Sequence, residues 1–358
     1  MCNIAGYIGN EQAAPILIDL LRRQQYYDGA AGTGIATIHN GVLYSAKVVG
    51  DVDELLRTTD VLNFPGTIGI AHSRPGGDEV EHMHPFLDHS GKLALVANGI
   101  FSTTATPEYM ENTRRLMHGY YERGIEIRSA LPPDGTGMFF LPDGFRYHGT
   151  ESYALRTGEL CADGMPLCAA LAKTLSERPN AIVAVAIHAD APDTIAIGKL
   201  DRPMTVGMVG DDTYIATTQF AFPENLVFDT LVQPPEGVVC AARAGELTVT
   251  RHRVGNMRME RVTADIYKKA YDLIEAYLRG KKEDPKNLWD LGRMHATEWR
   301  HIWQEPYSDC VYYKEDALFK PYAELSYNVL FAMQKEGRLH KTLKLRQGRY
   351  PMYHFYLD

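Results

Sequence analysis

The residue best suited to covalent chemistry is Cys2, which follows the initiator methionine and leads into an apolar stretch at residues 3–8. Chain ends fray unless something holds them in place. If Met1 is removed, Cys2 becomes N-terminal, and its α-amine, with a reference pKa of about 7.7–8.0, can accept the thiol proton at neutral pH. One residue would then supply both nucleophile and base. The alternative is that Cys2 is an ordinary small apolar residue near a terminus.

Two further features could serve an attack on a carbonyl group. Asn98 and Gly99 follow the apolar run at residues 93–96 and offer a side-chain amide and an unobstructed backbone N–H, the two donors that an oxyanion hole needs. The same pair is also a strong hairpin-turn signal. Arg74 ends another apolar run, and its planar fork suits a carboxylate, although an arginine at a strand end is often a surface cation.

A metal site is not expected. His82 and His84 could form a metal pair on one strand face, but no third ligand has suitable spacing. The five cysteines are odd in number, scattered and without CxxC spacing, which argues against a zinc site or a disulfide framework. We therefore predict no metal and no cofactor, and a reducing, cytoplasmic setting.

Composition excludes two classes of partner. The 358 residues carry a formal net charge of −8, with 45% hydrophobic and 23% charged residues, so there is no basic footprint for nucleic acid. No stretch approaches the roughly 20 apolar residues of a membrane span. We expect neither a nucleic-acid partner nor a membrane partner.

The elements that must position these residues change in character near residue 260. Before it, short β-branched runs recur between turns, with helices predicted at 13–25, 108–123 and 165–177, which indicates an α+β layered domain. After it, apolar residues follow a helical spacing. We predict a catalytic domain at 1–258 and a mostly helical region at 259–358, in which Trp289, Trp299 and Trp303 lie in a compact helical core. The aromatic tail at 346–356 is expected to dock onto the main domain or a partner chain.

The motifs occur in a characteristic order: M-C-x-I-x-G at 1–6, L-R-R at 21–23, Y-D at 27–28, G-I-A-H-S-R at 69–74, H-P at 84–85 and N-G-I at 98–100. This order resembles class II glutamine amidotransferases, and most of all the glutaminase domain of glucosamine-6-phosphate synthase. The resemblance covers roughly residues 1–250 and implies the four-layer αββα fold of N-terminal nucleophile hydrolases. Residues 259–358 are too few for that family's sugar isomerase domain, so no sugar-phosphate site is expected there.

The resemblance also implies roles for individual residues. Cys2 would be nucleophile and base, Asn98 and Gly99 would form the oxyanion hole, Arg74 would hold the α-carboxylate of glutamine, and His84 would be a structural or gating residue of the pocket.

The sequence departs from the family's pattern at several points. Asn3 replaces a glycine, Ala97 replaces a histidine, and a shortened Pro-Gly-Gly loop at 75–77 replaces the family's tryptophan-containing lid. The aspartate that binds the substrate α-amine has only a loose counterpart in Glu151. These departures put the substrate in question more than the cysteine chemistry.

We therefore expect amide hydrolysis by an N-terminal cysteine, with glutamine as the first candidate substrate and ammonia as product. A separate partner synthase or a second copy of the chain are the candidate partners. Two alternatives stay open. One is the same mechanism on a different amide, and the other is an inactive homologue that acts as a binding or regulatory module.

Overall fold

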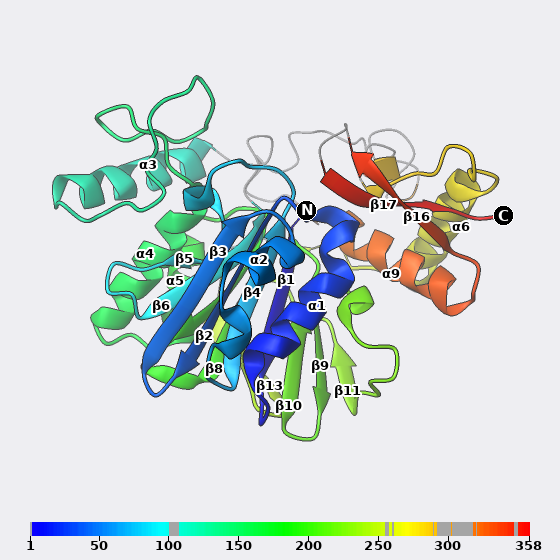
Figure 1. Ribbon diagram of the computed structural model, residues 1–358, viewed down its shortest axis with the longest axis horizontal. Helices are drawn as coiled ribbons and strands as arrows, with labels where there is room; N and C mark the ends of the chain where they lie inside the picture. The colour runs from blue at the N-terminus through cyan, green and yellow to red at the C-terminus, as the bar shows by residue number, and fades with distance from the viewer. Residues whose placement is uncertain are drawn as a thin grey trace.

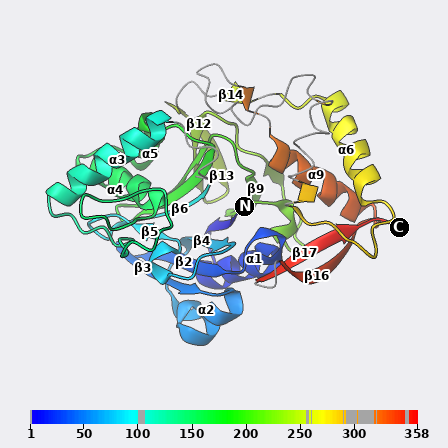
Figure 2. The same cartoon turned by 90° about the horizontal axis from the view of Figure 1, so that it is seen from above.

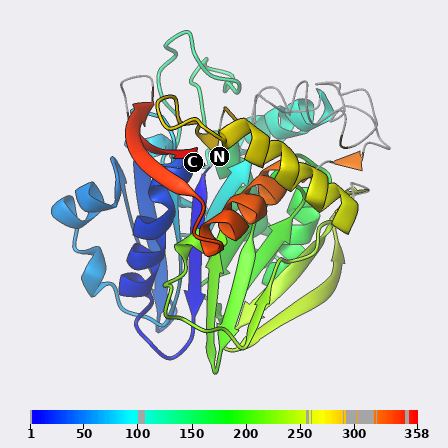
Figure 3. The same ribbon diagram turned by 90° about the vertical axis from the view of Figure 1, so that its right-hand side faces the viewer.

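The computed structural model describes residues 2–99, 107–254, 258–259, 261–288, 290–291, 302, 318–319, 321–346 and 350–358. Two sheets face each other at its centre, and helices cover both outer faces (Figures 1 and 3). The first sheet contains, in spatial order, β11 (Thr230–Val232), β9 (Thr205–Val209), β10 (Asp212–Ala216), β1 (Asn3–Ile8), β4 (Ile68–Arg74), β2 (Gly32–His39) and β3 (Val42–Val49). The second contains β13 (Glu246–Arg253), β12 (Val238–Arg243), β8 (Ala191–Lys199), β7 (Ile182–His188), β6 (Leu93–Gly99) and β5 (Phe86–Leu87).

Side-chain alternation along the strands explains why the sheets stack. On β1, Ile4 and Ile8 point into the core between the sheets, whereas Ala5 and Tyr7 point outward beneath a helix. On β6, Val96 faces the inter-sheet core and Leu95 faces the opposite layer. These two strands thus bury both faces, and fully burying one such aliphatic side chain contributes about 1.5–3 kcal/mol.

Helices cover the outer faces of both sheets. The helix α1 (Ala13–Asp28), with the short α2 (Val52–Thr58), packs on the first sheet. The second sheet is covered by α4 (Gly149–Ala162) and α5 (Leu167–Glu177), with α3 (Pro107–Glu122) packed against them. The four-layer α+β sandwich that the resemblance implies is therefore confirmed. Within the described ranges, no helix combines the length and apolar character of a membrane span.

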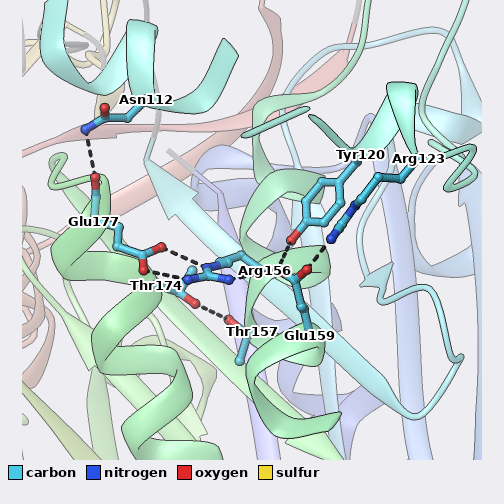
Figure 4. A network of polar contacts seen from close by, with 8 residues as sticks. All are labelled: Asn112, Tyr120, Arg123, Arg156, Thr157, Glu159, Thr174 and Glu177. Carbon is cyan, nitrogen blue, oxygen red and sulfur yellow. Dashed lines mark hydrogen bonds and ion pairs between the residues drawn. The ribbon is translucent and has the colours of Figure 1, made fainter. Parts of the chain in front are cut away.

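A polar network ties together the three helices of the second outer layer (Figure 4). Arg156 donates to both carboxylate oxygens of Glu177, at 2.9 and 2.8 Å, and to Glu159 at 2.8 Å. Glu159 also accepts from Tyr120 and Arg123, on and just after α3. These residues line an open cleft of about 720 Å³. Because each charge is paired, the network fixes the packing of these helices.

The C-terminal region contains more than helices. The helices α6 (Ala264–Leu278) and α9 (Tyr322–Lys335) share one apolar cluster with the hairpin of β16 (His340–Arg346) and β17 (Tyr350–Tyr356). The hairpin, which the sequence analysis did not predict, lies against α1 (Figure 2), where Tyr353 contacts Tyr26 and Tyr27 at ring distances of 5.9 and 5.1 Å. The predicted tryptophan core falls on Trp289, Trp299 and Trp303, which lie outside the described residues.

Candidate active site

Cys2 and Asn98 meet across the two sheets. Cys2 precedes β1 of the first sheet, and Asn98 lies near the end of β6 in the second. The Cys2 backbone N–H donates to Asn98 Oδ1 at 3.2 Å, and Asn98 Nδ2 donates to the Cys2 carbonyl oxygen at 3.1 Å. An amide nitrogen carries two hydrogens, so Asn98 keeps one donor beyond this pair. The structure therefore brings together two predicted residues that are 96 positions apart.

Gly99 occupies a position that only glycine fits. Its φ is +140°, and a Cβ built there would lie 2.3 Å from the carbonyl oxygen of Ala181 and 2.8 Å from the Cα of Ile182. Side chains are strongly disfavoured at such a φ. The close approach follows from the pairing of Gly99 with Ile182 on β7. This close packing against β7 accounts for a glycine at position 99. The hairpin turn that an Asn-Gly pair can also indicate is not needed to explain it.

Opposing effects act on the Cys2 thiol. Burial raises the pKa of this thiol, whereas the positive charges of the terminal amino group, Arg74 and Arg202 lower it. Burial also raises the pKa of Cys161 to about 12 and that of Cys168 to about 11. Within the described ranges, no three His, Cys, Asp or Glu side chains are grouped as metal ligands.

Arg74 ends β4 and is held by neutral groups. Its Nη1 donates to the His82 carbonyl oxygen at 2.7 Å and lies 3.2 Å from His148 Nε2. Among the described residues no carboxylate pairs with Arg74. Its guanidinium therefore has no counter-ion among the described residues and can take an external one.

His84 and His72 clamp the peptide of Ala97, immediately before Asn98. His84 Nδ1 accepts from the Ala97 N–H at 3.2 Å, and His72 Nε2 lies 3.1 Å from the Ala97 carbonyl oxygen, to which it donates. The two rings stack at 3.9 Å with 9° between their planes. Burial lowers the pKa of His72 to about 3 and that of His84 well below its usual value. Both are neutral at pH 7, so they act as hydrogen-bonding groups that position the strand.

Glu151 is engaged by the protein itself. From the first turn of α4, one carboxylate oxygen accepts from the Arg128 N–H at 2.7 Å, and the other accepts from the Ser129 N–H at 2.9 Å and from the Ser129 hydroxyl. Burial raises the pKa of this carboxyl, against these hydrogen bonds and nearby Lys47. The contacts favour a role in holding the loop at 128–129. Binding of a substrate amine by Glu151 stays a prediction.

The sequence analysis missed two side chains of this pocket. His148 precedes α4, stacks on Phe86 at 4.8 Å and contacts Arg74. Lys47 on β3 donates to the Met83 carbonyl oxygen at 2.9 Å, and burial lowers its pKa to about 8. Histidine has no special capping preference, and a lysine in a strand is ordinarily solvated. Neither residue therefore carried a signal in the sequence.

Known proteins resemble the chain in sequence and fold. The isomerizing glutamine–fructose-6-phosphate aminotransferase of Pyrococcus horikoshii is 29% identical over 227 residues, which are 62% of this chain and 33% of that protein. Its counterpart in Streptomyces coelicolor is 30% identical over 228 residues, which are 62% of this chain and 32% of that protein. The chain thus matches about a third of the length of these relatives. No protein-family model matches it.

Solved structures show the same fold. Glutamine phosphoribosylpyrophosphate amidotransferase from B. subtilis superposes with a TM-score of 0.55 at 17% identity, over 77% of this chain and 58% of that one. A structure described as the allosteric regulatory enzyme of purine biosynthesis gives a TM-score of 0.56 at 18% identity, with the same coverage of 77% and 58%. Together, these likenesses confirm that the chain resembles the class II glutamine amidotransferases, as its motifs predict.

Proposed function

We propose that the protein hydrolyses a carboxamide, with glutamine as the first candidate, through Cys2 after removal of Met1. The observation that carries the proposal is the pair of hydrogen bonds between Asn98 and the backbone of Cys2. This pair holds the nucleophile beside the donors that an oxyanion requires. The sequence relatives, which are named as glutamine-dependent enzymes, support the choice of substrate.

In the proposed reaction the α-amine of Cys2 takes the thiol proton, and the sulfur attacks the carboxamide carbon. The second Nδ2 hydrogen of Asn98 and the Gly99 N–H stabilise the tetrahedral oxyanion. The ammonium then returns its proton to the leaving nitrogen, so that ammonia departs and a thioester remains. Water hydrolyses the thioester, giving the acid and the free thiol. Asn98 Oδ1, which accepts from the Cys2 nitrogen, would stabilise the protonated amine between these steps.

Substrate recognition would rest on Arg74 and the clamped strand. Arg74 has no internal carboxylate partner within the described part of the chain, so it can bind the substrate α-carboxylate through its planar fork. His84 and His72 would act indirectly by fixing the Ala97 peptide. These contacts favour the structural role over the gating role, the two roles that the resemblance implies for His84.

A second candidate keeps the mechanism and changes the amide. It is favoured by the contacts of Glu151, whose two oxygens are already used by residues 128 and 129. An α-amine would then lack its predicted partner. A substrate with a carboxamide and a carboxylate but no amine would fit such a pocket.

The first test is intact-mass spectrometry before and after incubation with 6-diazo-5-oxo-norleucine, a glutamine analogue that alkylates the nucleophile. We expect Met1 to be absent and a single adduct on Cys2. Cys2→Ala should show no adduct and no ammonia release, whereas Cys161→Ala, with its partly buried thiol outside the site, should behave as wild type. Ammonia release by Cys2→Ala at the wild-type rate would overturn the proposal.

The second test separates the two candidate substrates. Ammonia release from glutamine is compared with release from glutaramate, which keeps the carboxylate and the carboxamide but lacks the α-amine. A large preference for glutamine supports recognition of the amine and the first candidate. Equal or faster turnover of glutaramate supports the second candidate.

A further inference from the structure

Tyr327, on α9 in the C-terminal region, has a buried hydroxyl group that makes no hydrogen bond to the described residues. The residue is 2% exposed, and its Oη has no partner in the part of the chain that the structure describes. Buried hydroxyls are paired in most proteins, so an unpaired one requires an explanation. A buried tyrosine hydroxyl usually has a hydrogen-bond partner in the protein or in a ligand.

Contacts on both sides of Tyr327 fix α9 against the N-terminal sheets. Glu324, one turn earlier, accepts from Lys199 Nζ at 2.6 Å at the end of β8. Asn328, the next residue, accepts from Gln233 at 3.0 Å. Figures 1 and 2 show α9 beside the N-terminal end of the chain. The position of Tyr327 is therefore determined by polar anchors and not only by apolar packing.

Aromatic contacts extend this attachment to α1. Phe331 on α9 packs edge-on against Phe220 at 5.2 Å, and Phe220 stacks on Tyr27 of α1 at 4.4 Å. Tyr27 also lies edge-on to Tyr327 at 6.5 Å. The end of α1 lies next to the start of β1, because Asn3 Nδ2 donates to the Gln25 carbonyl oxygen at 3.4 Å. These contacts place Tyr327 at the side of the site where the chain begins.

The Tyr327 hydroxyl and the Cys2 thiol are close enough to interact electrostatically, although no hydrogen bond joins these two described groups. Burial, the neighbouring Tyr27 and a negative charge on Cys2 all raise the pKa of the Tyr327 phenol. At neutral pH the group is therefore an intact O–H, able to donate a hydrogen bond. The other charged groups of the described residues that act on Cys2 are Arg74 from β4 and Arg202 from the segment after β8. Arg202 itself pairs with Asp201 at 3.2 Å.

We propose that Tyr327 donates a hydrogen bond to the sulfur of Cys2 when that sulfur is ionised, so that the C-terminal region completes the reaction centre. The inference rests on the proposed role of Cys2 as nucleophile. The sulfur must lose its proton in partly buried surroundings, where the charged form is disfavoured. A neutral donor from α9 offsets that cost without adding a further positive charge.

The test measures the pH dependence of alkylation of Cys2 by iodoacetamide in wild type and Tyr327→Phe, with the modified residue identified by peptide mapping. Loss of the donor is expected to raise the apparent pKa of the Cys2 thiol by about one unit, which is a tenfold slower reaction at neutral pH. If glutamine is the substrate, kcat should fall about tenfold with KM within twofold. The melting temperature should be unchanged or higher, because the hydroxyl removed had no partner.

Tyr353→Phe is the matched control. It removes a hydroxyl from the same aromatic cluster, since Tyr353 packs on Tyr27 at 5.1 Å from β17, and it should alkylate as wild type. Incorporation of 3,5-difluorotyrosine at position 327 gives a second readout that preserves the ring. This stronger donor should lower the apparent pKa of the Cys2 thiol, which a purely structural role would not do.

Three results would overturn the inference. These are an unchanged alkylation profile in Tyr327→Phe, an equal shift in Tyr353→Phe, and no shift with the fluorinated side chain. Alkylation that shifts as expected in a protein that does not hydrolyse glutamine would leave the inference standing and would count against glutamine as substrate. A processed wild type whose Cys2 resists alkylation at every pH would overturn both.

Discussion

The reaction centre and the recognition side of the candidate site differ in how their polar groups are used. At the proposed reaction centre, Asn98 contacts the backbone of Cys2 and keeps a second amide hydrogen that could serve an external oxygen. On the recognition side, both carboxylate oxygens of Glu151 accept hydrogen bonds from the loop at 128–129. Arg74 lies between these cases, because its partners in the described part of the chain are a carbonyl oxygen and an imidazole.

The difference suggests that the two parts of the candidate site are constrained differently: the polar groups around Cys2 leave a donor free, whereas the carboxylate of Glu151 is already fully hydrogen-bonded. A preorganised donor pair lowers a barrier without further rearrangement. A fully satisfied carboxylate must first give up its internal partners to bind a ligand, which has a cost for each bond lost. The chemistry can thus be retained while the substrate differs from that of the relatives.

The largest effect is expected from the reaction centre. Asn98→Ala removes the oxyanion donor and both contacts to Cys2, and kcat should fall by about 10²–10³, or ~2.7–4 kcal/mol. Steady-state ammonia release measures it, with circular dichroism to confirm folding. Asn112→Ala is the control, because Asn112 donates only to the Glu177 carbonyl oxygen on the outer helices. A loss shared by both variants would mean that Asn98 acts through stability alone.

The stacked pair of His72 and His84, which holds the Ala97 peptide next to Asn98, should make the stability of the fold sensitive to acid. The pKa of His72 is about 3 in the folded protein, against about 6.5 in an unfolded chain. Between these values the unfolded state binds more protons, so stability falls as pH drops below about 6.5. From pH 7 to pH 5 this residue alone should cost about 2 kcal/mol.

Urea unfolding at pH 7 and pH 5 measures this cost. His72→Asn should lose about 2 kcal/mol less on acidification than wild type, whatever its stability at pH 7. His252→Asn, on the exposed strand β13, should lose as much as wild type. Equal acid sensitivity in all three proteins would show that carboxylates, and not the clamp, govern the acid response.

The recognition side gives a smaller and different effect. In Glu151→Gln the new amide nitrogen cannot accept the hydrogen bonds that the carboxylate receives, so unfolding free energy should fall by about 1–2 kcal/mol. If Glu151 serves only the loop, KM for glutamine should rise no more than stability predicts. A large rise in KM with unchanged stability would instead assign Glu151 to the substrate amine. Glu108→Gln, on exposed α3, is the control.

Most of the layered fold was accessible from the sequence because its strands are strongly patterned. The alternation of Ile4, Gly6 and Ile8 on β1 and the apolar run before Asn98 fix which faces are buried. The helix α4 was missed because Gly149, Gly158, two threonines and one serine in it have weak helix propensity. Its burial against the second sheet overrides that propensity.

The candidate reaction centre could be proposed from the sequence for another reason: the residue types themselves suggest the chemistry. Cysteine, Asn-Gly and arginine suggest their roles before any contact is known. Tyr327 and His148 do not suggest a role by their type, because the roles proposed for them depend on which atoms lie nearby. A tyrosine in an apolar helix is indistinguishable in sequence from a core residue. The partners of Glu151, separated from it by more than 20 positions, could be found only in three dimensions.

The smallest effect is expected from Arg156, which belongs to neither side of the site. Arg156→Lys loses the two-pronged contact with Glu177 but keeps the charge. Because Arg156 and Glu177 are partly exposed, the loss in unfolding free energy should stay below about 1 kcal/mol, measured by urea unfolding. Turnover should be unchanged. A fall in kcat without a loss of stability would mean that α4 transmits strain from this network to its first turn, where Glu151 holds the loop at 128–129. Such a result would link the packing of the outer helices to substrate recognition.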